Sequence, residues 1–534
     1  MIERNAERSL WRLTRQAALT TVLPMALLAA ACVASQESGP GSYSSTKAMR
    51  LFSTGYKDIQ EVYIDEVEMS DLVVAGLSKL STLDPDFSIL SDRDSVTIAI
   101  DGGEAHTFLT PQSGDLDAWG DLTASALGLG LRHSRRLETE GSASLYEAVF
   151  DGVLDRLDGF SRYSGREEAQ NNRASRDGFG GIGVRIRIVD EGVRVLSVMD
   201  NTPAERAGLR DDDVIIAIEG ESAVGLDQRE VVRRLRGPLR SSVNIEVTRA
   251  DFSDRLSFDI KRGHIVPQTV TYRPDRGVAY IKVSGFNQNT ARMLRMKLIQ
   301  ARDQLGDDLQ GYVLDLRGNP GGLLDQAVAV SDLFVRRGRI VSTHGRHPDS
   351  HQYFEADPDD EAAGRPVVVL INGNSASASE IVAAALQDAG RAVLIGSNSY
   401  GKGTVQTVLR LPNEGELTLT WARFHAPSGY ALDKRGVLPD ICIESEDESA
   451  GQILAGLRQG RHAVDPRVRQ ASIEPDDAPA LKALRAHCPA KEGSSDLDLE
   501  VAIGLLSDRT LYRAALRGLG GDVQSTQSGL ATFD

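Results

Sequence analysis

Apolar residues fall into short runs of two different periods in the second half of this chain of 534 residues. The five apolar residues 367–371 predict a buried strand, because a run this short and rich in valine fits a strand better than a helix. The apolar residues of 381–388 suit a helix, and 392–395 predicts a second strand. A strand, a helix and a second strand in this order can bring a group at the helix start close to the turn after the second strand.

The preceding part of the chain has other patterns. Residues 51–174 have a mainly helical spacing, and residues 35–45, rich in Ser and Gly, predict a linker. Between 178 and 262 the apolar residues alternate in four short runs, which predicts a separate β-rich module with one helix at 227–235. The runs are 184–188, 193–196, 214–218 and 243–247. A strand is predicted at 417–424, and an amphipathic helix near 496–506.

Length and charge agree with a multidomain protein. At 534 residues and 41% apolar content, the chain can form three or four domains with real cores. Its 60 basic and 76 acidic residues give a net charge of −16, which argues against nucleic acid as the main partner.

The N-terminus has the pattern of an export signal. Four arginines precede an apolar stretch at 17–31, which is short for a membrane span. The small residues before Cys32 fit either a signal-peptidase site or acylation of Cys32 itself, and both interpretations stay open. The other two cysteines, Cys442 and Cys488, could pair in an oxidising compartment or remain two buried thiols.

Lys402 is the first candidate for chemistry, because it stands between two glycines after the second predicted strand. A free lysine has a pKa of about 10.4, so a general base near pH 7 needs a shift worth roughly 4–5 kcal/mol. Burial in an apolar site can supply such a shift. We therefore expect Lys402 to be buried without a carboxylate partner and within a hydrogen bond of a serine hydroxyl. Ser375, Ser377 and Ser379 all lie at the predicted helix start, and the local pattern does not choose between them.

These segments resemble the carboxy-terminal processing peptidases, a serine/lysine family. The matching pieces are Ser375 to Ile381, Arg391-Ala392, Gly401 to Gly403 and Val405-Gln406, with Ser399 where many members have threonine. The resemblance implies that Ser377 is the nucleophile, Lys402 the general base and Gln406 the residue that orients the lysine. The stretch 315–322 resembles the family's Asp-Leu-Arg-x-Asn-Pro-Gly-Gly motif, which implies an oxyanion hole formed by Gly321 or Gly322 together with the amide of Ala378.

The β-rich module resembles a PDZ domain, with residues 180–183 (Gly-Gly-Ile-Gly) at the carboxylate-binding loop. Successive backbone amides there suit the terminal carboxylate of a peptide, which would add as a strand. The implied peptide-binding residues are Gly181, Ile182, Gly183, Val184, Val231 and Leu235. Arg236 matches an arginine that regulates the active site in gated relatives, although a solvated arginine is the simpler interpretation.

The expected fold class is α/β multidomain. It comprises a signal peptide (1–31), a linker (32–50), a helical N-terminal region (51–175), a PDZ domain (176–264), a peptidase core built as a crotonase- and Clp-like βα spiral (265–445) and a C-terminal helical extension (446–534). The resemblance also implies dimers or larger homo-oligomers.

The expected function is an exported serine endopeptidase of the bacterial periplasm or cell envelope, which acts on proteins with exposed C-termini. A lipid anchor at Cys32 is a further possibility. A catalytically silent PDZ scaffold is the main alternative, and an acyl-CoA enzyme is disfavoured because it has no use for a peptide-binding module. No cofactor is expected. The close spacing of His344, His347 and His351 is ascribed to a solvated loop rather than to a metal site.

Overall fold

The computed structural model describes residues 43–100, 105–445 and 447–518. The predicted signal peptide and Cys32 lie outside these residues. The first helix, α1 (Ser45–Val62), begins inside the predicted linker. No helix of the described chain has both the length and the apolar character needed to cross a membrane.

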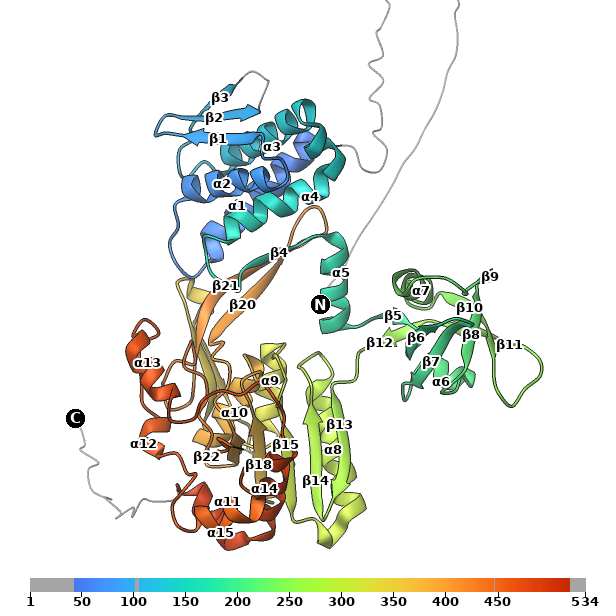
Figure 1. Ribbon diagram of the computed structural model, residues 1–534, viewed down its shortest axis with the longest axis vertical. Helices are drawn as coiled ribbons and strands as arrows, with labels where there is room; N and C mark the ends of the chain where they lie inside the picture. Colours follow the sequence, from blue (N-terminus) through green and yellow to red (C-terminus); the bar gives the residue numbers. More distant parts are fainter. Residues whose placement is uncertain (1–42, 101–104, 446, 519–534) are drawn as a thin grey trace, which may run out of the picture. The chain divides into compact units, whose positions relative to one another are not determined.

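The N-terminal region contains four main helices and a small sheet that the prediction of a mainly helical region missed (Figure 1). The helices are α1, α2 (Met69–Ser78), α3 (Leu116–His133) and α4 (Arg135–Leu154). The antiparallel strands are β1 (Phe87–Ser91), β2 (Ser95–Ile100) and β3 (His106–Leu109). Val96, Ile98 and Ile100 alternate with more exposed residues along β2, so the period of two was present in the sequence.

The β-rich module has a sheet with the order β11-β10-β8-β7-β6. Its strands are β6 (Val184–Val189), β7 (Gly192–Val198), β8 (Val214–Ile218), β10 (Ser242–Thr248) and β11 (Leu256–Lys261), with helix α7 at Gln228–Leu235. Strands β6, β7, β8 and β10 and helix α7 agree with the four predicted strands and the predicted helix, whereas β11 was not predicted. Among the described residues β6 pairs on one side only, so its outer edge is open to an added strand. A two-stranded ribbon, β5 (Phe179–Gly181) with β12 (Gly263–Ile265), joins the two ends of the module.

The core sheet has the order β13-β14-β15-β18-β19-β22, and all neighbours from β14 onward are parallel. Its strands are β13 (Val270–Asp275), β14 (Val278–Val283), β15 (Gly311–Asp315), β18 (Val367–Ile371), β19 (Val393–Gly396) and β22 (Ile441–Cys442). Helices α8 (Thr290–Leu305), α9 (Leu324–Asp332) and α10 (Ala378–Asp388) pack in one hydrophobic cluster with the sheet. The predicted strand, helix and strand are β18, α10 and β19.

Helices of the C-terminal segment form a second hydrophobic cluster with the same strands. They are α11 (Ala450–Leu457), α14 (Asp496–Ser507) and α15 (Arg509–Leu516), and α14 coincides with the predicted amphipathic helix. A buried ion pair joins Asp498 of α14 to Arg317, 2.9 Å apart. Cys442 and Cys488 form a disulfide, which settles the two alternatives for these cysteines. The segment after residue 446 is therefore an integral layer of the core.

A second sheet, β17-β16-β21-β20, carries the residues that follow Lys402. Its strands are β16 (Arg339–His344), β17 (Gln352–Glu355), β20 (Thr404–Arg410) and β21 (Glu416–His425), which contains the predicted strand 417–424. The short strand β4 (Arg162–Ser164) pairs with the start of β21. Segments about 250 residues apart in sequence thus meet at the far end of the β20–β21 hairpin, where the side chain of Asn413 donates to the Tyr163 hydroxyl.

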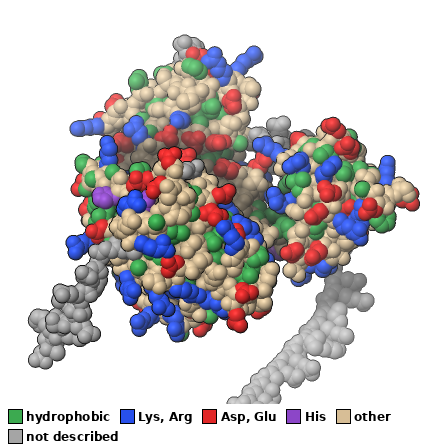
Figure 2. All heavy atoms as spheres, turned by 60° about the horizontal axis from the view of Figure 1, so that its bottom comes forward, with side chains coloured by type: hydrophobic (Ala, Val, Ile, Leu, Met, Phe, Trp, Pro, Cys, Tyr) green, Lys and Arg blue, Asp and Glu red, His purple; other side chains and the backbone are tan. Residues whose placement is uncertain are grey.

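Acidic and basic side chains are interspersed on the face shown in Figure 2. This view shows no broad area of basic charge of the kind that binds nucleic acid.

Candidate active site

The hydrogen bonds of the three serines distinguish Ser377 from its neighbours. The hydroxyl of Ser375 donates to the carbonyl of Leu316, and that of Ser379 donates to the carbonyl of Asn319, each at 2.9 Å. Both serines are fully buried. Ser377 is half-buried, and its hydroxyl donates no hydrogen bond to the described residues; it lies at the start of α10 in a capping box with Glu380. The hydroxyl protons of Ser375 and Ser379 are therefore engaged in the loop, whereas that of Ser377 is not.

The backbone of Ser377 is strained. It immediately precedes α10 and has φ 56° and ψ −114°, a region that non-glycine residues rarely occupy. Such a conformation costs on the order of 1–3 kcal/mol and persists where the surroundings impose it. This residue is the N-cap of α10, and developing negative charge is stabilised at a helix N-terminus.

A single carboxylate joins the serine loop to the lysine turn. One oxygen of the fully buried Glu380, Oε2, accepts hydrogen bonds from the backbone amides of Ser377 (2.7 Å) and Lys402 (2.9 Å). The other, Oε1, accepts from the Ser399 hydroxyl (2.5 Å) and the Gly401 amide (2.7 Å). Burial raises the pKa of Glu380, and these four donors oppose the rise by stabilising the ionised form.

No role was predicted for Glu380. The signal was present, however, because a serine followed three residues later by glutamate before an apolar run is a helix-start pattern. Ser399, which stands where many members of the family have threonine, donates its hydroxyl to Glu380 and accepts a hydrogen bond from the amide of Val437.

Lys402 is partly buried, and burial lowers the pKa of its amine. The positive charge of Arg162 lowers this pKa further, while Asp158 and Glu380 raise it. No carboxylate of the described residues lies within 4.0 Å of the amine, as expected of a base that must be neutral to act. The amine lies 4.9 Å from the centroid of the Phe160 ring.

The expected hydrogen bond between Lys402 and Ser377 is not formed in the described structure. The Glu380 carboxylate fixes the two backbones side by side but leaves the flexible lysine side chain to rotate. The amine rests against Phe160 instead. Catalytic hydrogen bonds often tighten only when substrate is bound.

Gln406 lies on β20 with its amide nitrogen held by two threonines. Its Nε2 donates to the hydroxyls of Thr404 (2.8 Å) and Thr420 (3.3 Å). This orientation leaves the side-chain oxygen as the atom that could accept a hydrogen bond from an amine. Gln406 does not bond to Lys402 here, so its orienting role stays a prediction.

The two candidate oxyanion-hole glycines differ. The amide of Gly321 donates to the side-chain oxygen of Asn319 (2.9 Å), so it is already engaged. The amides of Gly322 and Ala378 have no acceptor among the described residues. A Cβ at Gly321 would come within 2.8 Å of the Ser377 Cβ, so only glycine allows this close approach. These contacts favour Gly322 with Ala378 as the donor pair.

The polar residues before these glycines brace the site. Asp315 and Arg317 form a buried ion pair, 2.8 Å apart, in which the Asp315 carboxylate also accepts from the Tyr280 hydroxyl. The side chain of Asn319 donates to the carbonyl of Val283. These bonds fix the end of β15, from which the glycine turn leads to α9.

The predicted peptide-binding residues of the β-rich module are mostly buried. Ile182, Val231 and Leu235 belong to its hydrophobic cluster, while Val184, on the open edge strand β6, is partly exposed. Gly181 pairs with Gly263, and Gly183 has φ 89° with no room for a Cβ beside Thr202. Of the four apolar residues, Val184 beside the unpaired edge of β6 is therefore the one with an exposed part, and the peptide-binding role of the set stays a prediction.

Arg236 ends α7 and contacts no residue of the serine–lysine pair. Its guanidinium lies 3.9 Å from the centroid of the Phe179 ring and 3.5 Å from the side-chain oxygen of Asn171. Burial lowers the pKa of Arg236, so it is not a fully solvated arginine. Its regulatory role stays a prediction.

The predicted solvated loop of histidines is more ordered than expected. The rings of His344 and His351 stack at 5.4 Å, and His425 lies 4.8 Å from His344. Among the described residues, no group of three His, Cys, Asp or Glu side chains has a geometry that could hold a metal ion.

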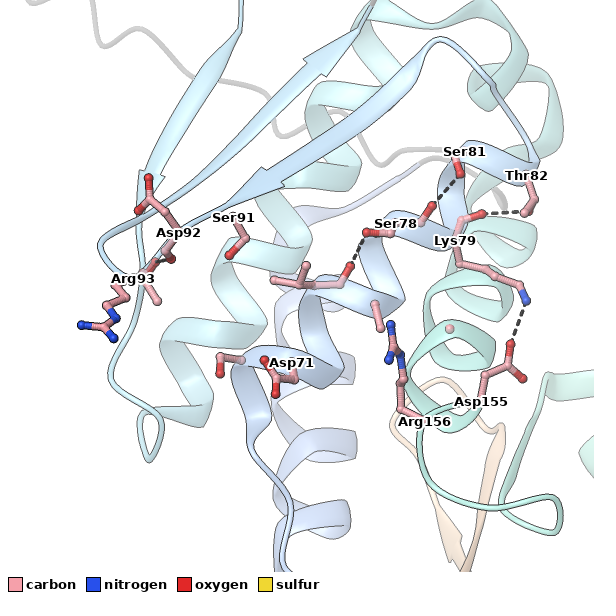
Figure 3. Close-up of a pocket in the computed structure, with 15 residues that line it drawn as sticks. Asp71, Ser78, Lys79, Ser81, Thr82, Ser91, Asp92, Arg93, Asp155 and Arg156 are labelled. Atoms are coloured by element: carbon pink, nitrogen blue, oxygen red, sulfur yellow. Dashed lines mark hydrogen bonds and ion pairs between the residues drawn. The ribbon is translucent and has the colours of Figure 1, made fainter.

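A large polar cavity lies in the N-terminal region, with a volume of about 1040 Å³ (Figure 3). Lys79 in its wall forms an ion pair with Asp155 (2.7 Å). The hydroxyls of Ser78, Ser81 and Thr82 donate to backbone carbonyls of their own helix turns. Its lysine is thus paired with a carboxylate and these three hydroxyls are engaged, in contrast to Lys402 and Ser377.

Comparisons with known proteins identify the family of this chain. Residues 277–443 match the profile of Peptidase family S41, and residues 194–249 match a PDZ domain. A carboxy-terminal-processing protease of Bartonella bacilliformis is 40% identical over 344 residues, which are 62% of this chain and 79% of the relative. The carboxy-terminal processing protease CtpB of Bacillus subtilis is 35% identical over 375 residues, 68% and 75% of the two chains.

Among solved structures, the photosystem II D1 C-terminal processing protease covers 74% of this chain and 92% of its own, with 24% identity and a TM-score of 0.37. The two relatives, together with the two profiles, show that the protein is a serine peptidase of family S41 that carries a PDZ domain. Within that family, the chain belongs to the carboxy-terminal processing proteases. The expected fold class and enzyme class are confirmed.

Proposed function

We propose that this protein is an exported endopeptidase that binds the C-terminal tails of protein substrates and cleaves them by a serine–lysine mechanism. The observation that carries the mechanism is the shared Glu380 oxygen, which bonds the backbones of both Ser377 and Lys402. The backbones of a serine that donates its hydroxyl proton to no described residue and of a lysine with a lowered pKa thereby stand side by side.

In the proposed acylation step, the Lys402 amine swings from Phe160 to the Ser377 hydroxyl and accepts its proton. The serine oxygen attacks the peptide carbonyl, and the amides of Gly322 and Ala378 donate to the oxyanion. The C–N bond then breaks as the lysine ammonium returns its proton to the leaving amine. A water molecule, deprotonated by the same lysine, hydrolyses the resulting ester and restores the serine.

The PDZ domain is proposed to select substrates by their terminal carboxylate. The open edge of β6 and the glycine-rich approach to it support addition of an extended tail as a further strand. The oxygen of Gln406 is proposed to steady the lysine ammonium, since its nitrogen is held by two threonines. Arg236 is proposed to report tail binding, because it is wedged between the module and Asn171 of α5 (Arg166–Asp177).

Export is proposed from two independent features. The arginines and apolar stretch at the N-terminus have the pattern of a signal, and the Cys442–Cys488 disulfide suits an oxidising compartment. We place the protein in the bacterial periplasm or cell envelope, with Cys32 as the residue that would carry a lipid anchor.

The test compares full-length wild type with Ser377→Ala and Lys402→Ala on unstructured polypeptides that differ only in their C-terminal residues. Loss of the nucleophile should reduce kcat by about 10⁴-fold or more, and loss of the base by about 10²–10⁴-fold. Lys47→Ala, on an exposed face of α1, is the matched control and should cut normally. Unchanged cleavage by both active-site variants would refute the mechanism. Tail binding without cleavage by the wild type would instead favour a silent scaffold.

A further inference from the structure

The segment 157–163 leads into β4, and the proposed mechanism gives it no task. Its residues form a tight turn around Asp158. One carboxylate oxygen of Asp158 accepts from the amides of Phe160 (2.6 Å) and Ser161 (2.7 Å), and the other accepts from the Ser161 hydroxyl (3.1 Å). The turn therefore holds the Phe160 side chain in a defined place.

This turn is attached to β21, the strand whose residue Thr420 binds the side chain of Gln406. The amide of Thr420 on β21 donates to the Ser161 hydroxyl (3.1 Å), while the Thr420 hydroxyl accepts from the Gln406 side chain (3.3 Å). Next to this contact, Arg162 of β4 pairs with Thr418 of β21. One residue, Thr420, thus connects the turn to the proposed lysine-orienting glutamine.

The turn also reaches the lysine itself. The Phe160 ring is partly buried, and its centroid lies 4.9 Å from the Lys402 amine, which has no hydrogen-bond acceptor among the described residues. An apolar ring at this distance occupies the place of water that would otherwise solvate the ammonium.

We propose that Phe160 is a positioning residue for peptide hydrolysis: the N-terminal region supplies it as one wall of the active site, where it keeps water from the Lys402 amine. This inference rests on the proposed role of Lys402 as the base. The N-terminal region thereby completes the catalytic site as well as packing against the core.

Two effects of the ring on the lysine oppose each other. The aromatic face attracts the ammonium, which favours the protonated form, whereas exclusion of water favours the neutral amine. Burial is the largest influence on the pKa of Lys402, and it lowers the pKa. The other charged groups that act on the amine are Arg162, which lowers the pKa, and Asp158 and Glu380, which raise it. Since burial dominates, removing the ring should raise the pKa.

The experiment measures kcat against pH for full-length wild type, Phe160→Ala, Phe160→Leu and Phe160→Tyr on one tailed polypeptide. We expect Phe160→Ala to move the acidic limb of the kcat profile to a pH about one unit higher. Near pH 7 this shift lowers kcat about tenfold, and kcat recovers at alkaline pH. Phe160→Leu keeps an apolar cover and should retain the wild-type limb, and Phe160→Tyr should do the same. Phe108→Ala, another partly buried phenylalanine of the N-terminal region, is the matched control.

A second readout does not depend on turnover. In the Ser377→Ala background, competitive acetylation of Lys402 at a series of pH values, quantified by mass spectrometry, reports the pKa of the amine directly. Phe160→Ala should shift this midpoint upward, and Phe160→Leu should not. An unchanged midpoint in Phe160→Ala overturns the inference, and so does a uniform loss of kcat at all pH values. If Lys402→Ala retains full activity, the proposed mechanism fails instead, whatever the labelling shows.

Discussion

Replacing Glu380 with glutamine tests how the two catalytic loops are held together. The substitution keeps the size of the side chain but exchanges one acceptor oxygen for an NH₂ group. Four donors converge on the carboxylate: the amides of Ser377, Gly401 and Lys402 and the hydroxyl of Ser399. An amide cannot accept from all of them.

The magnitude follows from the two orientations of the amide. If the nitrogen of the glutamine side chain occupies the Oε2 position, the backbone N–H groups of both Ser377 and Lys402 lose their acceptor. If the nitrogen occupies the Oε1 position instead, only the Gly401 amide loses its acceptor, because the Ser399 hydroxyl can turn and accept a hydrogen bond from the new NH₂ group. The second orientation costs about 1–3 kcal/mol for the unsatisfied donor. Exchanging a charged for a neutral acceptor costs about 1 kcal/mol at each remaining bond.

The weaker bonds to a neutral acceptor are offset by removal of a buried charge, whose desolvation raises the pKa of Glu380. We therefore expect Glu380→Gln to lower the free energy of unfolding by about 1–3 kcal/mol, the cost of the amide left without an acceptor. A shift of the loops should also lower kcat by roughly 10²-fold. Urea denaturation and peptidase assays of the same preparations measure both quantities. Glu168→Gln, in the exposed first turn of α5, is the matched control and should change stability by less than about 0.5 kcal/mol. The reasoning is refuted if Glu380→Gln matches wild type in both stability and kcat.

Two further predictions concern stability. The disulfide closes a loop with a sequence separation of 46 residues, so reduction, or the double variant Cys442→Ser/Cys488→Ser, should lower the free energy of unfolding by about 2–4 kcal/mol. If reductant lowers the urea midpoint of the double variant as much as that of wild type, the loss of stability on reduction does not come from this disulfide. His425 has a buried ring nitrogen, Nδ1, without a hydrogen-bond partner among the described residues, and burial followed by the nearby His344 lowers its pKa. Its contribution to stability is complete above the unfolded pKa of about 6.5 and is lost as the pH falls toward the folded pKa, by up to about 1.4 kcal/mol per pH unit. His425→Leu should flatten the fall in stability between pH 7.5 and 5.5, and an equal slope in both proteins would contradict this account.

Local pattern was sufficient for most elements. The strands β18 and β19 and the helix α10 were predictable because a buried strand and an amphipathic helix have different apolar periods, and the alternation in the PDZ domain worked for the same reason. The sheet β1–β3 was missed although β2 alternates, because it is a short insertion among long helices. The polar contacts of the C-terminal segment were not predictable, since Arg317 and Asp498 lie far apart in sequence.

The sequence by itself determined the family, the order of the elements and a short set of candidate residues, because motifs and periodicity are local properties of the chain. Local pattern did not separate Ser377 from Ser375 and Ser379, and only the family resemblance selected it. The tertiary structure alone shows that the Ser375 and Ser379 hydroxyls are bound to carbonyls of Leu316 and Asn319, some sixty residues away. The same holds for Glu380, whose role requires the Lys402 turn to lie against α10, and for Phe160, which reaches the lysine only because β4 pairs with β21. A hydroxyl becomes a nucleophile, and a lysine a base, through the neighbours that bind or desolvate them. Those neighbours are brought together by folding.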